Sequence, residues 1–228
     1  MLKIKITIVK LKLIWFEPTD SIKSDSLFFL NFKYLAYYCQ IIKMDIYHFF
    51  NSVQPLSKAA IGKLGLLMHE KTYVKNESIQ AIGSRCKTIY FVKEGCARIF
   101  YYKDGNDITE HFAFKNDLIV RAESLFTGKP TAKGIQAIDQ TILIGIDAQK
   151  LFELYNAHHE IERLFRLLFE KEYVNTVKRL ESLQFKTAKE RYQELLETTN
   201  FVQKIPLKHI ASYLGITQVS LSRIRAEK

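Results

Sequence analysis

The sequence predicts an α+β protein, in which a small antiparallel barrel or sandwich is followed by a long helix and a C-terminal helix-turn-helix. From residue 71 onward, short runs rich in β-branched and aromatic residues alternate with turn sequences, a spacing typical of a small barrel or sandwich. Beyond residue 147 the apolar residues recur at three- and four-residue intervals, which indicates helices. The final two dozen residues contain two short helical patterns on either side of a glycine.

Composition limits the class of protein. A length of 228 residues allows one large or two small domains. The net charge of +10 and the pI near 9.4 favour a polyanionic partner such as nucleic acid. Cys39, Cys86 and Cys96 are too few and too scattered for a disulfide framework, and none has C-x-x-C spacing. We therefore expect reduced thiols, no metal site and no cofactor.

The first 43 residues differ from the rest. Residues 2–13 alternate apolar and polar positions like a strand, and residues 27–42 are aromatic and suit either a helix or a strand. No run reaches the roughly 18 apolar residues that span a bilayer, and no signal-peptide pattern is present. We therefore expect a cytoplasmic protein with no membrane partner. One hypothesis is that Met44 is the biological initiator; the alternative is a genuine extra hairpin or a membrane-surface arm.

The middle of the chain changes from helix to strand. Residues 45–70 have helical spacing, and Ser57 is placed to cap a helix. Two sequences, at 93–95 and 103–106, have the composition of hairpin turns. The expected strands are 72–74, 88–92, 97–102, 108–112, 134–138 and 142–146.

Three helices are expected next. Asp147 is a candidate N-cap for a helix that ends at Tyr155. A long helix covers residues 160–184, and a further helix covers 187–199, with a hinge near 183–186. From its spacing alone, the apolar stripe of the long helix is expected to pack on the barrel; it comprises Ile161, Leu164, Leu168, Tyr173, Val177 and Leu180.

The C-terminal pattern specifies two short helices around a tight turn. Pro206 suits a first helical position, and Gly215 suits a left-handed cap between the helices. Thr217 is a plausible N-cap for the second helix, in which Leu221 and Ile224 face inward. An ordinary helical hairpin that only packs remains the alternative to a DNA-binding unit.

The second helix carries side chains that suit DNA. In a helix-turn-helix this helix enters the major groove, where Gln pairs with adenine, Arg with guanine, and Ser with either. We expect base-edge contacts from Gln218, Ser222 and Arg223. For phosphate contacts we expect Lys208, Thr217, Ser220 and Arg225.

The run PLKHIASYLGIT followed by LSRIR, at residues 206–217 and 221–225, resembles the C-terminal DNA-binding end of the Crp/Fnr family of bacterial transcription regulators. The resemblance implies a cyclic-nucleotide-binding-type β-roll (a jelly-roll-like barrel) over 44–158. It further implies a dimerisation helix over 159–184 and a helix-turn-helix domain over 185–228. The resemblance does not extend into residues 1–43, which form a separate N-terminal extension. The implied protein is a cytoplasmic homodimer that binds double-stranded DNA and works with RNA polymerase.

Members of that family that bind cyclic AMP carry a Gly-Glu-Leu motif and then an Arg-Ser-Ala motif. The corresponding positions here are 120–122, Val-Arg-Ala, and 130–132, Pro-Thr-Ala. Because the ribose carboxylate and the phosphate arginine are both replaced, we predict no tight binding of cyclic AMP. An unknown small-molecule effector, or none, remains open, and its candidate contacts are Arg121, Glu123, Lys129 and Thr131.

Two other functions remain as alternatives. The first is an effector-sensing dimer that has no DNA function. The second is an enzyme built on the barrel, which would need clustered histidines to hold a metal. His111 stands alone in its expected strand, so we do not expect an enzyme.

Overall fold

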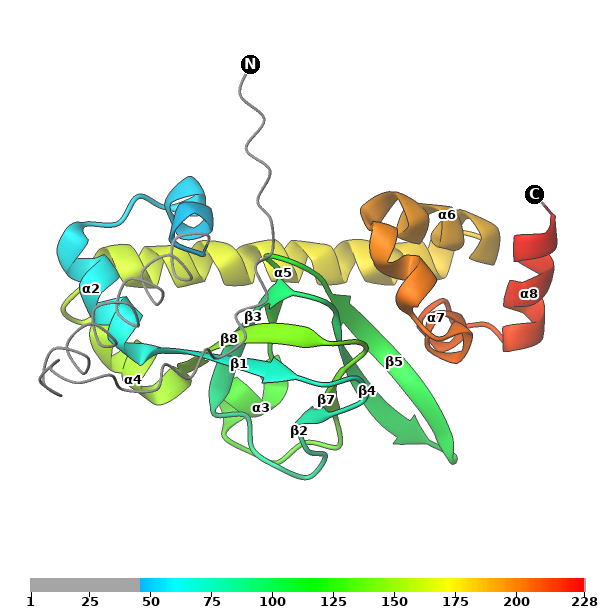
Figure 1. Cartoon of the computed structure of the whole chain (residues 1–228), viewed down its shortest axis with the longest axis horizontal. Coiled ribbons are helices and arrows are strands. Elements are labelled where there is room, and N and C mark those ends of the chain that lie inside the picture. Colours follow the sequence, from blue (N-terminus) through cyan, green and yellow to red (C-terminus); the bar gives the residue numbers. More distant parts are fainter. Residues whose placement is uncertain (1–45, 228) are drawn as a thin grey trace, which may run out of the picture. The chain divides into compact units, whose positions relative to one another are not determined.

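The structure is a computed structural model that describes residues 46–227 (Figure 1). The predictions for 2–13, 27–42 and a start at Met44 lie outside the described residues. None of the helices in the described residues could span a lipid bilayer.

A β-roll of two four-stranded sheets forms the centre of the described chain, and every strand pairing is antiparallel. Apolar side chains from both sheets share one core, among them Val92 from the first sheet and Ile99 and Ile135 from the second. The first sheet has the order β1 (Met68–Tyr73), β8 (Thr141–Asp147), β3 (Thr88–Glu94) and β6 (Leu118–Ile119). The second has the order β2 (Ser78–Gln80), β7 (Gly134–Ala137), β4 (Ala97–Lys103) and β5 (Asn106–Ala113).

The two expected hairpins have different outcomes. The turn at 103–106 is a hairpin, because β4 and β5 pair from Lys103 and Asn106 onward; Asp104 and Gly105 take the positive φ that such a tight turn needs. The prediction of a hairpin at 93–95 is wrong, because β3 and β4 belong to different sheets. There the chain crosses from one sheet to the other at Gly95, whose φ is +88° and where a Cβ would lie 2.4 Å from the Gln140 carbonyl oxygen.

A second core lies between the first sheet and the helices around it. Helical residues 46–53, α2 (Lys58–Leu67), α4 (Ala148–Tyr155) and the start of α5 (His159–Phe185) all contribute to it. Phe91 of β3 meets Phe50 and Phe165 edge-on, with ring centroids 5.1 and 6.1 Å apart. Edge-on aromatic pairs add stabilisation beyond the area that they bury.

The caps predicted for these helices are confirmed. The Ser57 side chain accepts from the Ala60 amide, and the Asp147 side chain accepts from the Lys150 amide. The expectation of helix over all of 45–70 is wrong at its end, because Met68 begins β1 and pairs with Ile146 of β8. Pairing in the sheet therefore overrides the helical spacing of the last three residues.

The longest helix in the described part is α5 (Figure 1). Its first half packs on the roll, because Ile161, Leu164 and Leu168 are buried. Its second half leaves apolar side chains exposed: Tyr173, Val174, Val177, Leu180, Leu183 and Phe185. Packing on the roll therefore accounts for only the first half of the predicted stripe.

Three helices and one 3-10 turn complete the chain: α6 (Ala188–Thr198), η1 (Asn200–Lys204), α7 (Leu207–Tyr213) and α8 (Gln218–Ala226). Thr187 and Glu190 form a reciprocal capping box at α6. Pro206 is the N-cap of α7 and not its first helical residue, so the helix begins one residue later than predicted. Gly215 has a φ of +70° between α7 and α8, and Thr217 caps α8 as predicted. The predicted α+β fold class is confirmed.

Candidate nucleic-acid interface and effector pocket

Helix α8 is fixed by its apolar face and leaves its polar face open. Leu221 is fully buried and Ile224 is partly buried in the core of the C-terminal helices. Val219 is 62 % exposed. The other side chains predicted to contact DNA from this region are exposed, except Ser220, which is partly buried; they are Lys208, Thr217, Gln218, Ser222, Arg223 and Arg225.

The start of α8 is held by a local hydrogen-bond pair. The Thr217 hydroxyl oxygen accepts from the Ser220 amide at 3.1 Å and lies 3.0 Å from the Ser220 hydroxyl. These contacts occupy part of the hydrogen-bonding capacity of both hydroxyls in the free protein. In DNA-binding helix-turn-helix proteins, the side chains that meet base edges and phosphates come from the N-terminal end of the second helix.

Two arginines secure the turn that precedes α8. Arg191 of α6 donates to the Leu214 carbonyl oxygen at 2.8 and 3.2 Å. Arg179 of α5 donates to the Tyr213 carbonyl oxygen and lies over the Tyr213 ring, 3.6 Å from its centroid. The C-terminal carbonyls of a helix lack partners and carry partial negative charge, so both cations stabilise the end of α7.

The roll and the C-terminal helices are joined through β5 and α7. Strand β5 is an edge of its sheet, and the Thr109 amide on that edge donates to the Ser212 hydroxyl of α7 at 3.1 Å. Phe112 of β5 packs against Tyr213, with ring centroids 5.0 Å apart. Cys96, Phe112 and Ile138 of the roll therefore share one apolar cluster with the core of the C-terminal helices.

A buried polar cluster lies at the same junction. The Arg98 side chain is 2 % exposed and binds both carboxylate oxygens of Asp107 at 2.6 and 2.7 Å. It also donates to Gln136 and Thr109. Burial opposes ionisation of Asp107, but the Arg98 contacts hold the pKa of that carboxyl below its ordinary value.

His209 brings α7 to this cluster. It is 3 % exposed, and its Nδ1 lies 4.0 Å from an Asp107 carboxylate oxygen. This nitrogen has no hydrogen-bond partner among residues 46–227. Burial and the Arg98 charge lower the pKa of His209 to about 4, although Asp107 acts in the opposite direction. His209 is therefore neutral at neutral pH. This cluster was not predicted, because its only signal in the sequence is a charged residue, Arg98, inside an otherwise apolar strand.

A small pocket of about 400 Å³ opens beside α3 (Ala122–Thr127) and the segment that follows it. Glu123 and Thr131, two of the predicted effector contacts, line it together with Tyr101 and an ion pair between Lys133 and Glu110. The pocket is therefore polar and carries both signs of charge.

The other two predicted effector residues lie elsewhere. The Lys129 side chain is exposed and outside this pocket. Arg121 is 3 % exposed, and its guanidinium donates to Gln80, Ser84 and the carbonyl oxygens of Ala81 and Lys133 at 2.8–3.0 Å. The protein itself thus uses most of the donors of Arg121.

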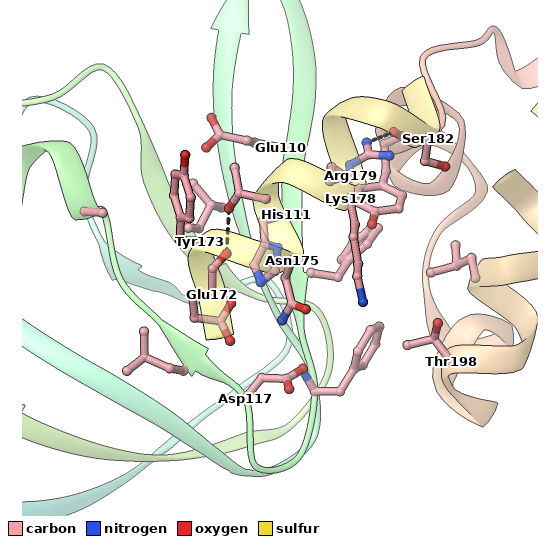
Figure 2. Close-up of a pocket in the computed structure, with 18 of the residues that line it drawn as sticks. Glu110, His111, Asp117, Glu172, Tyr173, Asn175, Lys178, Arg179, Ser182 and Thr198 are labelled. Carbon is pink, nitrogen blue, oxygen red and sulfur yellow. Dashed lines mark hydrogen bonds between the residues drawn. The ribbon is translucent and has the colours of Figure 1, made fainter. Parts of the chain in front are cut away.

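A larger cleft, of about 1240 Å³, is bordered by β5, α3, α5 and the C-terminal helices. Figure 2 shows Glu110 and His111 from β5 together with Glu172 and Arg179 from α5. Burial and the Arg179 charge lower the pKa of His111 to about 4. Burial and the neighbouring Asp117 raise the pKa of Glu172. No group of three or more potential metal ligands occurs within the described residues.

Comparisons with known proteins define the class. Residues 70–158 match the cyclic nucleotide-binding domain family. The structure is similar to that of FixK2 from Bradyrhizobium japonicum, with a TM-score of 0.61 and 21 % identity over 70 % of this chain and 83 % of that one. It is also similar to a Crp/Fnr-family transcriptional regulator from Eubacterium rectale, with a TM-score of 0.60 and 21 % identity over 75 % of this chain and 83 % of that one.

A third similar structure is CLP, a c-di-GMP responsive global regulator of Xanthomonas campestris, with a TM-score of 0.59 and 14 % identity over 75 % of this chain and 91 % of that one. No curated protein sequence matches the chain. Residues 70–158 therefore match a cyclic nucleotide-binding domain. Over the part of the chain that the similar structures cover, the fold is that of the Crp/Fnr regulators, as the resemblance at residues 206–225 implied.

Proposed function

We propose that this protein is a homodimeric, sequence-specific DNA-binding regulator of transcription that does not respond to cyclic AMP. The observation that carries the proposal is the division of α8 into two faces. Leu221 anchors the helix, whereas Gln218, Ser222 and Arg223 stand exposed on it. These three residue types are those that read adenine and guanine edges in the major groove.

The second half of α5 supports the dimer. Its apolar side chains, Tyr173 at 72 % exposed and Leu180 at 55 % exposed among them, have nothing to cover them within the described residues. A long helix with an uncovered apolar face gains stability by packing against a second copy. In a two-fold dimer the two α8 helices would then meet successive major grooves.

The contacts of Arg121 support the lack of a cyclic AMP response. A cyclic nucleotide requires cations or amides for its phosphate and an acceptor for its ribose hydroxyls. Arg121 stands where the ribose carboxylate of responsive relatives is expected, and its donors are already used by the roll. An effector, if bound in the roll, would contact Glu123 and Thr131 in the small polar pocket instead.

Selection of bound DNA from a random pool tests the proposal. The full-length dimer should enrich a two-fold symmetric motif at moderate salt, because specific readout exceeds phosphate attraction there. A variant with Gln218, Ser222 and Arg223 all changed to Ala should enrich none. Lys150→Ala, on the exposed face of α4, serves as the matched control and should select the same motif as the unchanged protein. Selection without any motif from the unchanged protein would refute the proposal.

A further inference from the structure

We propose that the contact between β5 and α7 is a proton-operated latch: neutral His209 holds the helix-turn-helix on the β-roll, and protonation of His209 releases it. The proposal concerns the position of α7 on the roll and does not depend on DNA binding. It rests on the burial of His209 at this contact and on the charges beside it, which include no carboxylate free to pair with a protonated imidazole.

His209 is buried at the junction between α7 and the roll. His209 belongs to the first helix of the helix-turn-helix, yet it is only 3 % exposed and faces Asp107 of β5 and Arg98 of β4. Release of α7 from the roll would return its imidazole to water. The cost of charging the imidazole therefore differs between the docked and the released arrangement, and this difference links protonation to docking.

The charges around the imidazole do not favour a second positive charge. Asp107 is the only carboxylate of the described residues with an appreciable effect on His209, and its two oxygens already bind the Arg98 guanidinium at 2.6 and 2.7 Å. Arg98 and Lys208, the latter on α7 itself, both oppose a second positive charge. A protonated His209 would therefore be a buried cation beside a carboxylate that is already neutralised, which is unfavourable.

Besides His209, little that is polar joins α7 to the roll at this edge. The Thr109 amide donates to the Ser212 hydroxyl, and the apolar part of the contact is centred on Phe112 and Tyr213. The only acid–base pair between α7 and the roll among the described residues is His209 with Asp107, 4.0 Å apart, and that carboxylate is already bound by Arg98. Lys204 of η1 and Asp139 of the roll lie 3.8 Å apart in a solvent-accessible pair, and such pairs are weak because water and salt screen them.

The size of the effect follows from the two pKa values of His209. With an ordinary pKa of 6.5 when released and about 4 when docked, acidification from about pH 7.5 to about pH 5 should lower the docking equilibrium roughly 30-fold. The sign is definite: because docking lowers the pKa, the contact is strongest above pH 6.5 and weakens as the pH falls through 6.5 toward 4.

Hydrogen–deuterium exchange of the full chain tests the latch. After correction for intrinsic rates, peptides from α7 and β5 should lose up to about 30-fold in protection between those two pH values. Strands β3 and β8 should keep theirs. His209→Gln, which cannot gain a charge, should keep α7 protected at both pH values. His111→Gln is the matched control, because His111 lies on β5, the strand that α7 contacts, and its pKa is similarly lowered; in this variant α7 should still lose protection in acid.

An acid response that persists in His209→Gln, or that disappears in His111→Gln, would overturn the proposal. A direct titration of the His209 imidazole by NMR provides a second measurement, which holds even where the glutamine variant docks poorly. The latch requires a midpoint well below 6.5 in the unchanged protein. A midpoint near 6.5 with α7 still protected would also overturn it.

Discussion

The Arg98 guanidinium shows what a single buried charge requires. It is 2 % exposed and relies on Asp107 for its counter-charge. Removal of one partner from a buried pair leaves the other charge uncompensated, which typically costs about 3–5 kcal/mol. We therefore expect Asp107→Ala to lower the free energy of unfolding by about that amount, measured by urea denaturation at neutral pH.

A matched variant separates burial from charge. Asp139 also pairs with a cation, but it and Lys204 are solvent-accessible. Asp139→Ala should lower the free energy of unfolding by less than about 1 kcal/mol. Equal losses in the two variants would show that the Arg98 cluster is not the buried network described above.

Single residues on α8 should divide between base and phosphate contacts. Arg223 and Arg225 are both exposed in the last turn of α8. Arg223→Ala should cost about 1–3 kcal/mol in binding and relax the preference at one base pair of each half-site. Arg225→Ala should weaken binding to all sequences alike. Binding measured across a library of single-base operator variants tests the assignment. A uniform loss of affinity for Arg223→Ala would show that Arg223 contacts phosphate and not a base.

Local chemistry determined which site residues the sequence could predict. Ser57, Asp147 and Thr217 cap helices that begin next to them, so a window of a few residues contains the whole signal. His209 lies more than 100 positions from Asp107 along the chain, and no local pattern links them. The role of Arg121 was hidden for the same reason, because its acceptors come from segments about 40 positions upstream and 12 downstream.

At the scale of elements, the proposed dimer gives α5 two tasks: its first half packs on the roll, and its second half packs against a second copy. Leu180 is 55 % exposed in its second half. In a two-fold dimer Leu180→Glu acts twice, and removal of a buried Leu side chain costs about 1.5–3 kcal/mol each time, so dimer dissociation should increase at least about 100-fold. Light scattering coupled to gel filtration measures the mass. Leu66→Glu on α2, where Leu66 is 81 % exposed, should remain dimeric; dissociation of both variants would contradict the assignment to α5.

Element types were easier to predict than their partners. Turn residues and apolar spacing located most strands and helices, because those signals are local. The error at 93–95 concerned which strands pair, since a glycine turn can close a hairpin or carry the chain to another sheet. The error at 68–70 arose because contact with Ile146 of β8 decides the conformation there, and the sequence around Met68 contains no trace of that contact.

For the whole molecule, the proposed regulator should show a characteristic response to salt. If Lys208 and Arg225 each contact one phosphate, a dimer makes four such contacts, and the logarithm of affinity should fall with that of salt with a slope of about −4. Lys208→Ala should reduce the slope to about −2, because two contacts disappear. Fluorescence anisotropy with a fixed operator at several salt concentrations gives both slopes, and an unchanged slope in the variant would exclude Lys208 as a phosphate contact.

The position of α7 over β5 has one more consequence. A strand at the border of a sheet offers free amides and carbonyls to any other strand that arrives, which is how many proteins begin to aggregate. Here Ser212 occupies one such amide, that of Thr109, and Tyr213 covers the neighbouring Phe112. Loss of α7 from this border would therefore expose the β5 edge and Phe112 to other molecules. We expect acidified samples to become turbid as protein concentration rises, and His209→Gln samples to stay clear under the same conditions.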